Sequence, residues 1–377
     1  MPRKVLMLLS NEFRPDPRVH KEALGLMSAG YEVTILAWNR DRTFPEKDAQ
    51  KGIEVRRIST RPITGTMSLI INYPSFLLRS FFRSRGLSFD VVHSNDLDTL
   101  LIGVLISRLR GVPLVYDAHE HYAKMVETDL PKSISPIIDR IEAMLVKRAS
   151  LVVAANEPIA DYLRPNTRSD IIVVMNCIDV PIMHHRIRDA AQNEFVLFYG
   201  GTLEPMRYIE ETILAIENTD NCRLRIAGLG RLKEMVQKSA QQSEKVEYLG
   251  FLPHDKLLSE MAESDAVLCL LDPSNENYRI ATPNRLCEAM ALGVPVIASN
   301  VTLTGEIVED TGCGISMDWS EENLAEAVRR LRDPALHAKL GENGIRAARS
   351  QYNWSEMKAR LLKSYDLLLS KRKFQNK

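Results

Sequence analysis

Short, continuous apolar runs recur along the first half of the chain and alternate with longer amphipathic stretches. Each run is typical of a strand that is buried on both faces of a parallel sheet. They read VLMLLS (5–10), EVTILAW (32–38), DVVHS (90–94), VPLVYDA (112–118), SLVVAAN (150–156) and DIIVVMN (170–176). Strand–helix–strand units of this kind predict a parallel sheet with right-handed crossovers.

The first intervening stretch shows how the helices begin and end. Asp16 and Pro17 are suited to the N-cap and the first helical position. A helix from this point would turn Val19, Ala23, Leu24 and Met27 inward, and it would stop at Gly30.

A second series of strands follows a polar stretch rich in His and Arg between about Asp179 and Glu194. Its runs are FVLFYGG (195–201), RLRIAGLG (223–230), KVEYLGF (245–251), AVLCLLD (266–272) and VPVIAS (294–299). The sequence therefore predicts an α/β protein with two doubly wound, Rossmann-like parallel-sheet domains. We place their boundary at 189/190, with the second domain ending at 354.

Composition narrows the class of protein. The 377 residues exceed what one hydrophobic core usually holds, and 49 basic residues balance 49 acidic ones, which gives no footprint for nucleic acid. Five single cysteines suit a reducing compartment, where we expect them to be buried structural thiols. We find no signal peptide and no apolar run long enough to span a membrane, so we expect a cytoplasmic protein.

The loop after the first strand of the second domain is suited to an anion. Gly200 and Gly201 allow close backbone approach, and a helix beginning near Pro205 would present free N–H groups. Thr202 follows these two glycines, and Arg207 can add a charged contact to a phosphate. The alternative is a glycine turn beside a solvated arginine.

A second loop, in the segment NENYRIATPNRLCEAMALGVPVIAS, opens another helix. Thr282 can cap it and Pro283 can take its first position. Arg285 and Glu288 then share one face, where the carboxylate can accept hydrogen bonds from a ribose diol and the guanidinium can meet a diphosphate. A surface ion pair is the alternative interpretation.

A third loop, RIAGLGR (225–231), carries Gly228 where a base or ribose lies in nucleotide-binding folds. The segment YLGFLP (248–253), which includes Leu252, would supply an apolar wall beside it.

These motifs resemble those of the family-4 type of retaining glycosyltransferases with the GT-B fold. The most specific match is PNRLCEAMALGVPVIAS, which resembles the family signature Pro-Asn-Lys-x-x-Glu-x-Met-Ala-x-Gly-x-Pro-Val-Ile, with Arg285 at the usual lysine. DPRVHKEALGLMSAGYEVTIL, DVVHSND and VYDAHE resemble its N-terminal segments. YNWSEMKARLLKSYDLL resembles its last helix, which implies that residues 355–377 pack back onto the domain 1–189.

The resemblance implies a nucleotide-sugar donor, a glycan or lipid-linked acceptor, and two domains that face an interdomain cleft. Glu288 would hold the donor ribose, Arg207 the diphosphate, and His119 would lie near the transferred sugar. The family needs no cofactor and generally no divalent metal, and we find no HExxH or clustered Cys and His.

Three features depart from the family pattern, and one of them is the first loop, SNEFRPDPR, where many relatives have a glycine-rich loop near the acceptor or the diphosphate. Gly201 replaces the usual arginine, so Arg285 or Arg18 would have to supply that charge. Ile280 replaces a usual glutamate, so backbone N–H groups around 281–283 would contact the donor sugar.

The first domain contributes the candidates around His119. This residue ends a strand directly after Asp117, so it could be catalytic or a satisfied strand-end histidine. His93 and Asp96 lie at a neighbouring strand end, and with Arg18 we expect them on the acceptor side.

Residues 61–89 mix large apolar side chains with four arginines. This pattern suits contact with a membrane surface, which would make the protein peripheral on the cytoplasmic face. An ordinary core helix with a basic outer face explains it equally well.

Three functions remain open from the sequence. The first is sugar transfer, the second is a GT-B sugar-nucleotide epimerase, and the third is a catalytically silent nucleotide-sugar-binding scaffold, which the departures at Gly201 and Ile280 motivate. A nicotinamide-dependent dehydrogenase is disfavoured because the first strand leads into SNEFRPD and not into GxGxxG.

Overall fold

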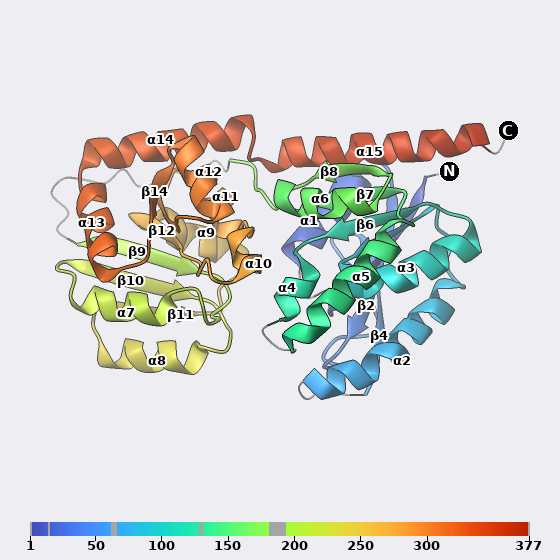
Figure 1. The fold of residues 1–377 in the computed structure, drawn as a ribbon, viewed down its shortest axis with the longest axis horizontal. Helices are drawn as coiled ribbons and strands as arrows, with labels where there is room; N and C mark the ends of the chain where they lie inside the picture. Colours follow the sequence, from blue (N-terminus) through green and yellow to red (C-terminus); the bar gives the residue numbers. More distant parts are fainter. Residues whose placement is uncertain (1, 14–15, 62–65, 128–130, 181–193, 376–377) are drawn as a thin grey trace. The chain divides into compact units, whose positions relative to one another are not determined.

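The chain, seen here in a computed structural model, folds as two compact units. The structure describes residues 2–13, 16–61, 66–127, 131–180 and 194–375, without the side chains of 66–70, 132 and 371–375. Unit 1 comprises Met1–Asn176 and Met357–Lys377, and unit 2 comprises Cys177–Glu356 (Figure 1). The boundary that we predicted at 189/190 falls within residues 181–193, which lie outside the described residues.

Unit 1 is built on an eight-stranded sheet with the order β3-β4-β2-β1-β5-β6-β7-β8. All neighbours are parallel except β3 and β4. The strands are β1 (Lys4–Leu9), β2 (Glu32–Asn39), β3 (Lys47–Gln50), β4 (Ile53–Ser59), β5 (Val91–Asn95), β6 (Leu114–Ala118), β7 (Leu151–Ala154) and β8 (Asp170–Val173). All six runs predicted for this half are strands. The hairpin of β3 and β4 was missed, because β3 is a half-exposed edge strand and the buried β4 (IEVRRIS) is interrupted by charged residues, so neither is a continuous apolar run.

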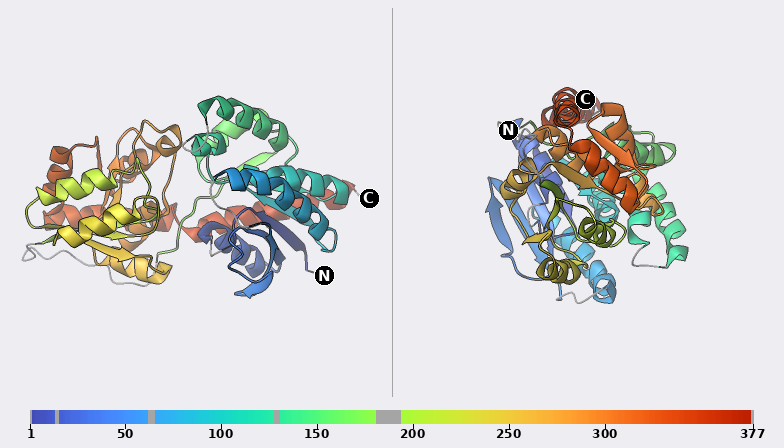
Figure 2. Two further views of the ribbon diagram at one scale, coloured as in Figure 1. Left: turned by 90° about the horizontal axis from the view of Figure 1, so that it is seen from below. Right: turned by 90° about the vertical axis from the view of Figure 1, so that its left-hand side faces the viewer.

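The helices of unit 1 cover both faces of this sheet (Figures 1 and 2). They are α1 (Pro17–Ser28), α2 (Thr66–Ser84), α3 (Leu97–Arg110), α4 (Tyr122–Val126), α5 (Ser135–Val146), α6 (Glu157–Leu163) and the C-terminal α15 (Trp354–Gln375). Short 3₁₀ turns lie at Lys132–Ile134 and Arg164–Asn166.

Helix α1 begins as predicted and differs on its inner face. Asp16 is its N-cap and accepts from the backbone N–H groups of Arg18 and Val19, with Pro17 in the first position. Two charged side chains, Arg18 and Glu22, are buried on the inner face, whereas Leu24 is only partly buried. An inner face with two charges needs partners inside the unit.

Unit 2 is built on a six-stranded, fully parallel sheet with the order β11-β10-β9-β12-β13-β14. Its strands are β9 (Phe195–Gly200), β10 (Cys222–Ala227), β11 (Val246–Gly250), β12 (Ala266–Cys269), β13 (Val296–Ser299) and β14 (Gly314–Met317). The helices are α7 (Ile209–Glu217), α8 (Lys233–Gln242), α9 (His254–Ala262), α10 (Glu276–Arg279), α11 (Asn284–Leu292), α12 (Leu303–Thr311), α13 (Glu321–Leu331) and α14 (Pro334–Ser350). The five predicted strands are all present, and β14 is added at the edge.

Both sheets reverse their strand order at one point, between β1 and β5 in unit 1 and between β9 and β12 in unit 2. Ligands of doubly wound folds bind beyond the carboxyl ends of the strands at such a point. The loops after β1, β5, β9 and β12 are therefore where a site is expected in each unit.

No helix in the part of the chain that the structure describes is long and apolar enough to cross a membrane.

Candidate functional site

In unit 2 the loops that follow β9 and β10 pack backbone against backbone. Gly201 has φ +151° and Gly228 has φ +146°, a region that favours glycine. A Cβ built on Gly228 would lie only 1.7 Å from the carbonyl oxygen of Gly201. The Gly201 N–H also donates to the Ala227 carbonyl oxygen at 3.0 Å. Both glycines are thus needed for the two loops to meet beyond the carboxyl ends of β9 and β10.

Arg285 lies against the first of these glycines. Its side chain is only 3% exposed, its Nε donates to the Leu268 carbonyl oxygen at 2.7 Å, and the guanidinium lies over the ring of Tyr199. A Cβ at Gly201 would come within 3.0 Å of its Nη1. The Nη2 atom is buried and has no hydrogen-bond partner among the residues that the structure describes. A buried cation with an unused donor, next to a glycine loop, is a candidate anion-binding group.

Arg207 lies in the same loop, but it does not begin a helix as we predicted. Helix α7 begins at Ile209, and Met206 (φ +62°) and Tyr208 (φ +51°) on either side of Arg207 are in the left-handed region. These residues pay a conformational cost that holds the loop in a defined shape. The guanidinium of Arg207 lies over the ring of Tyr278, and its Nε donates to the Tyr278 hydroxyl at 3.4 Å.

Glu288 projects from α11 and is 6% exposed. Its Oε1 lies 2.9 Å from the Nε2 of His254, the first residue of α9. Helix α11 begins one residue later than predicted. Pro283 is its N-cap and makes no side-chain cap bond, and Gly293 ends the helix with φ +71°. His254 was not among the predicted residues, because only the fold shows that α9 begins beside this carboxylate.

The remaining donor-side candidates lie around the same switch point. Gly200 ends β9, the Thr202 carbonyl oxygen accepts from the Tyr199 hydroxyl at 2.7 Å, and Leu252 is half-buried before α9. The segment expected to offer backbone N–H groups is partly engaged. The N–H of Ala281 donates to the Tyr278 carbonyl oxygen at 3.3 Å, and Ile280 is the C-cap of α10. Thr282 and Pro283 are both partly buried, and only Thr282 carries a backbone N–H, because proline has none.

In unit 1 a buried ion pair joins α1 to β6. The Nε of Arg18 donates to Asp117 Oδ2 at 3.0 Å, Nη2 contacts Oδ1, and Nη1 donates to the Val174 carbonyl oxygen at 2.5 Å. Burial opposes ionisation of Asp117, but Arg18 and His119 hold the pKa of its carboxyl well below the usual range. Arg18 is buried in the unit and does not line an acceptor surface as we expected.

His119 lies directly after β6 and is held between two carboxylates. Its Nε2 is 2.9 Å from Asp117 Oδ2, and its Nδ1 is 3.1 Å from Asp96 Oδ2. Asp96 is partly exposed and also accepts from the backbone N–H of His119 at 3.1 Å. Burial by itself would lower the pKa of His119, but Asp96 and Asp117 raise it well above the ordinary value. The ring is therefore an imidazolium whose two N–H groups both donate.

His93, like Arg18, does not lie on the acceptor side as we expected. It is fully buried, and its Nδ1 lies 2.6 Å from the hydroxyl of Tyr365 in α15. Burial lowers its pKa, so it is neutral. Because its side chain points to the face of the sheet and not beyond the strand end, it is inside the unit and not on an acceptor surface.

Glu22 completes the cluster and was not predicted. Burial raises the pKa of Glu22 to about 8, and the nearby Asp117 carboxylate adds to the rise. With Glu22 protonated and His93 neutral, two cations (Arg18 and His119) balance two anions (Asp96 and Asp117). Each buried charge of the cluster therefore lies near an opposite one, which offsets the cost of burying it.

Three residues of this cluster also meet the spacing of a metal site. Ligand atoms of Glu22, His93 and Asp117 lie within 4.8 Å of one another. The Arg18 guanidinium, however, contacts Asp117 and lies 3.3 Å from Glu22 Oε1, so a cation is already present. The residues therefore fit a metal poorly, and catalysis without a metal stays a prediction.

Comparison with known proteins assigns both halves of the chain to glycosyltransferase families. Residues 183–347 match the family described as Glycosyl transferases group 1, and residues 18–181 match Glycosyltransferase Family 4. Glycogen synthase of Mycobacterium tuberculosis is similar, with 24% identity over 384 residues that cover 93% of this chain and 91% of the relative.

Two solved structures share the fold. Sucrose-phosphate synthase from Thermosynechococcus elongatus aligns with a TM-score of 0.79 and 18% identity, covering 98% of this chain and 100% of that one. Anabaena HepE in complex with UDP-glucose aligns with a TM-score of 0.72 and 18% identity, covering 96% and 99%.

Proposed function

The chain belongs to the family-4 type of glycosyltransferases with the GT-B fold, and we propose that it transfers a sugar from a nucleotide-sugar donor with retention of the anomeric configuration. The observation that carries the proposal is the buried, incompletely paired guanidinium of Arg285 beside Gly201, one helical turn from the buried carboxylate of Glu288. A cation for a diphosphate and an acceptor for a ribose diol are thus set on one helix at the switch point of unit 2.

Each polar group of unit 2 has a role in this proposal. Arg285 and Arg207 bind the diphosphate and stabilise the negative charge that develops on it as the glycosidic bond breaks. Glu288 accepts hydrogen bonds from the ribose hydroxyls, which take the place of its contact with His254. The glycine loop brings backbone close to the phosphates. HepE is in complex with UDP-glucose, so a UDP-sugar is the first donor to test.

His119 acts at the transferred sugar in this proposal. An imidazolium whose N–H groups both donate cannot serve as a general base. It fixes the Asp96 carboxylate, and this partly exposed group accepts from a sugar hydroxyl. Nδ1 can donate to the sugar only in exchange for Asp96.

A donor screen tests the proposal directly. UDP-, GDP-, ADP- and dTDP-sugars are added to the purified chain, and one of them is expected to raise the melting temperature. The product formed with that donor and a glycan or lipid-linked acceptor is then analysed by NMR for its anomeric configuration. An inverted product overturns retention, and turnover of the donor without an acceptor indicates an epimerase.

The catalytic part is tested with His119→Ala. We expect the single-turnover rate to fall by about 100-fold or more while the donor dissociation constant changes less than threefold, because the contribution arises mainly in the transition state. Rates close to wild type would leave His119 with a structural role only. Donor binding with no turnover in the wild type would favour the silent scaffold.

We also propose a membrane contact for residues 61–89, next to a lipid-linked acceptor. Within this segment, residues 62–65 lie outside the described residues. The described part of α2 exposes Ile71, Leu78 and Phe82, with Arg79 directly after Leu78 and Arg83 directly after Phe82. Apolar side chains interleaved with arginines are the composition that a membrane interface binds.

A further inference from the structure

Exposed apolar side chains gather on three helices of unit 1. Among the residues that the structure describes, fifteen large hydrophobic side chains are exposed, and nine of them belong to α2, α3 and α5. The nine are Ile71, Leu78 and Phe82 on α2, Leu101, Leu105 and Leu109 on α3, and Ile137, Ile141 and Met144 on α5. The positions on α3 are four residues apart, so they form one outward stripe along the helix.

Strand alternation places these helices on one face of the sheet. Side chains in register on neighbouring parallel strands point the same way, and so do residues two apart on a strand. Ser94 of β5 is in register with Tyr116 of β6 and with Leu8 of β1. Leu8 is in turn in register with Leu36 of β2, and Trp38 lies two residues further along that strand. Ser94, Tyr116 and Trp38 therefore share one face.

Each helix packs against one of these residues. Gly103 of α3 lies against Ser94, Glu142 of α5 bonds to the Tyr116 hydroxyl, and Phe76 of α2 stacks on Trp38 with ring centroids 4.6 Å apart. Helix α3 contacts both α2 and α5, so the three helices form one layer (Figure 1). We call the outer side of this layer the three-helix face.

The charges on the three-helix face have one sign. Exposed basic side chains lie on the three helices and directly after them: Arg79, Arg83, Arg85, Arg108, Arg110, Arg140, Lys147 and Arg148. The acidic residues of these helices are Asp98, Asp139 and Glu142, and burial raises the pKa of both Asp98 and Glu142 to about 7. Asp139 is turned toward His121 and Tyr162. No acidic side chain of these described helices is exposed.

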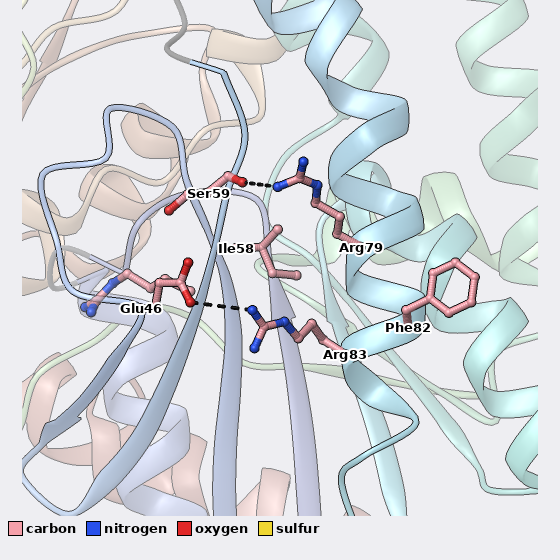
Figure 3. A pocket seen from close by; sticks show the side chains of 7 residues that line it. Glu46, Ile58, Ser59, Arg79, Phe82 and Arg83 are labelled. Atoms are coloured by element: carbon pink, nitrogen blue, oxygen red, sulfur yellow. Dashed lines mark hydrogen bonds and ion pairs between the residues drawn. The ribbon is translucent and has the colours of Figure 1, made fainter.

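A basic hollow borders the face where α2 meets β4. It has a volume of about 340 Å³, and Arg79 and Arg83 reach into it from α2 while Phe82 points to the other side of the helix (Figure 3). Arg79 donates to the Ser59 carbonyl oxygen at 2.7 Å, and Arg83 is 3.5 Å from Glu46. Cationic donors are thus held along the side of α2 that faces β4, which suits an anionic headgroup.

We infer that the whole three-helix face binds an anionic lipid surface, with the apolar stripes inserted and the basic side chains on the headgroups. This inference extends the membrane contact proposed for α2 and rests on it. The added observation is that six of the nine exposed apolar side chains on these helices lie on α3 and α5, outside residues 61–89. A second copy of the chain is the competing occupant, but two such basic faces would repel one another.

Vesicle flotation tests the inference. We expect the full chain to float with phosphatidylcholine vesicles that contain phosphatidylglycerol, to bind vesicles of phosphatidylcholine alone much more weakly, and to be released as salt is raised. Leu109→Glu, at a 67% exposed position on α3, should lower the partition to anionic vesicles about tenfold, because it places an acidic group in the interface. Arg108→Glu should lower it by roughly the same factor.

The matched control is Leu214→Glu on α7 of unit 2, at a position that is 58% exposed and outside the three-helix face. It should bind vesicles as the wild type does. Equal binding by Leu109→Glu and the wild type, or no preference for anionic lipid, overturns the inference. So does a wild-type dimer that Leu109→Glu converts to a monomer without any vesicle binding.

Donor binding separates this inference from the proposed function. Leu109→Glu should bind the nucleotide-sugar with wild-type affinity, because the residue lies on the outer side of α3. Absence of donor binding in the wild type would contradict the glycosyltransferase proposal, while the flotation result would stand or fall separately.

Discussion

The polar centre of unit 1 and the polar centre of unit 2 are built in opposite ways. In unit 1, Arg18, Asp117 and His119 satisfy one another inside the fold. In unit 2, Arg285 and Glu288 are equally buried but are not paired with each other, and Arg285 keeps a donor without a partner among the described residues. Buried charges that are paired with one another hold their side chains in place, whereas a buried charge with an unused donor can bind a ligand.

The largest effect that this comparison predicts is on the folding of unit 1. Asp117→Asn should lower the free energy of unfolding by about 3–5 kcal/mol, because it leaves the Arg18 guanidinium buried without its counter-ion. Urea denaturation of the full chain measures this. Asp96→Asn serves as the control, since Asp96 is partly exposed and its loss should cost much less. Similar losses in the two variants would contradict the description of Asp117 as the central anion.

The two centres also differ in how far the sequence predicts them. The unit 2 candidates follow strand ends and helix starts that are local in the sequence, so the sequence predicts Gly201 in one ligand-binding loop and Arg285 with Glu288 in another. The start of α7 was wrong by four residues, because Met206 and Tyr208 are in the left-handed region and no side-chain pattern announces this.

The unit 1 cluster depends on contacts between distant segments. His93 and Tyr365 are 272 positions apart, and the face to which His93 points depends on the strand order. Arg18 and Glu22 look like the solvated side of an amphipathic helix until their partners are known. The spacing of Leu101, Leu105 and Leu109 could be counted in the sequence, but which side of α3 meets the sheet could not.

The next effect concerns ligand affinity in unit 2. Glu288→Ala should weaken binding of the donor nucleotide by roughly 10- to 100-fold, the equivalent of about 1.5–3 kcal/mol for hydrogen bonds to a charged group. Isothermal calorimetry gives the affinity, and an unchanged melting temperature without nucleotide shows that the fold is intact. His254→Ala removes the partner of Glu288 but not the carboxylate, so it should leave affinity within a few-fold of wild type. Unchanged affinity in folded Glu288→Ala would remove Glu288 from the site.

A smaller effect follows from the raised pKa of Glu22 in unit 1. The pKa is about 8 in the folded chain against an ordinary 4.5, so the folded state binds the extra proton between these values. The free energy of unfolding of the wild type should therefore fall as pH rises from about 4.5 to about 8. Glu22→Gln keeps an uncharged group of the same shape and should lack this loss.

The measurement is the difference in unfolding free energy between the two proteins at the ends of that pH range. We expect the difference to shift by at least about 1.4 kcal/mol in favour of Glu22→Gln at the higher pH, since one pKa unit corresponds to that free energy. His119 also loses its stabilising contribution as pH rises through its raised pKa, but it does so in both proteins and cancels. Parallel pH profiles would show that Glu22 is ionised in the folded chain.

The smallest effect that we predict is an energetic coupling between positions 201 and 285. Its measurement tests whether position 201 is a glycine because Arg285 lies against it. An alanine at 201 would place its Cβ 3.0 Å from Nη1 of Arg285, and it would also have to adopt φ +151°. The backbone cost is the same whichever residue occupies 285, so it cancels in a double-mutant cycle of Gly201→Ala with Arg285→Lys. Arg285→Lys removes the contact with position 201, and its loss of the bond to the Leu268 carbonyl oxygen occurs with either residue at 201 and cancels as well. We expect a coupling free energy of about 0.5–2 kcal/mol in unfolding experiments, with Gly201→Ala tolerated better beside lysine. Strict additivity would mean that Gly201 serves the close packing against Gly228 alone, and that Arg285 does not depend on the glycine for its place.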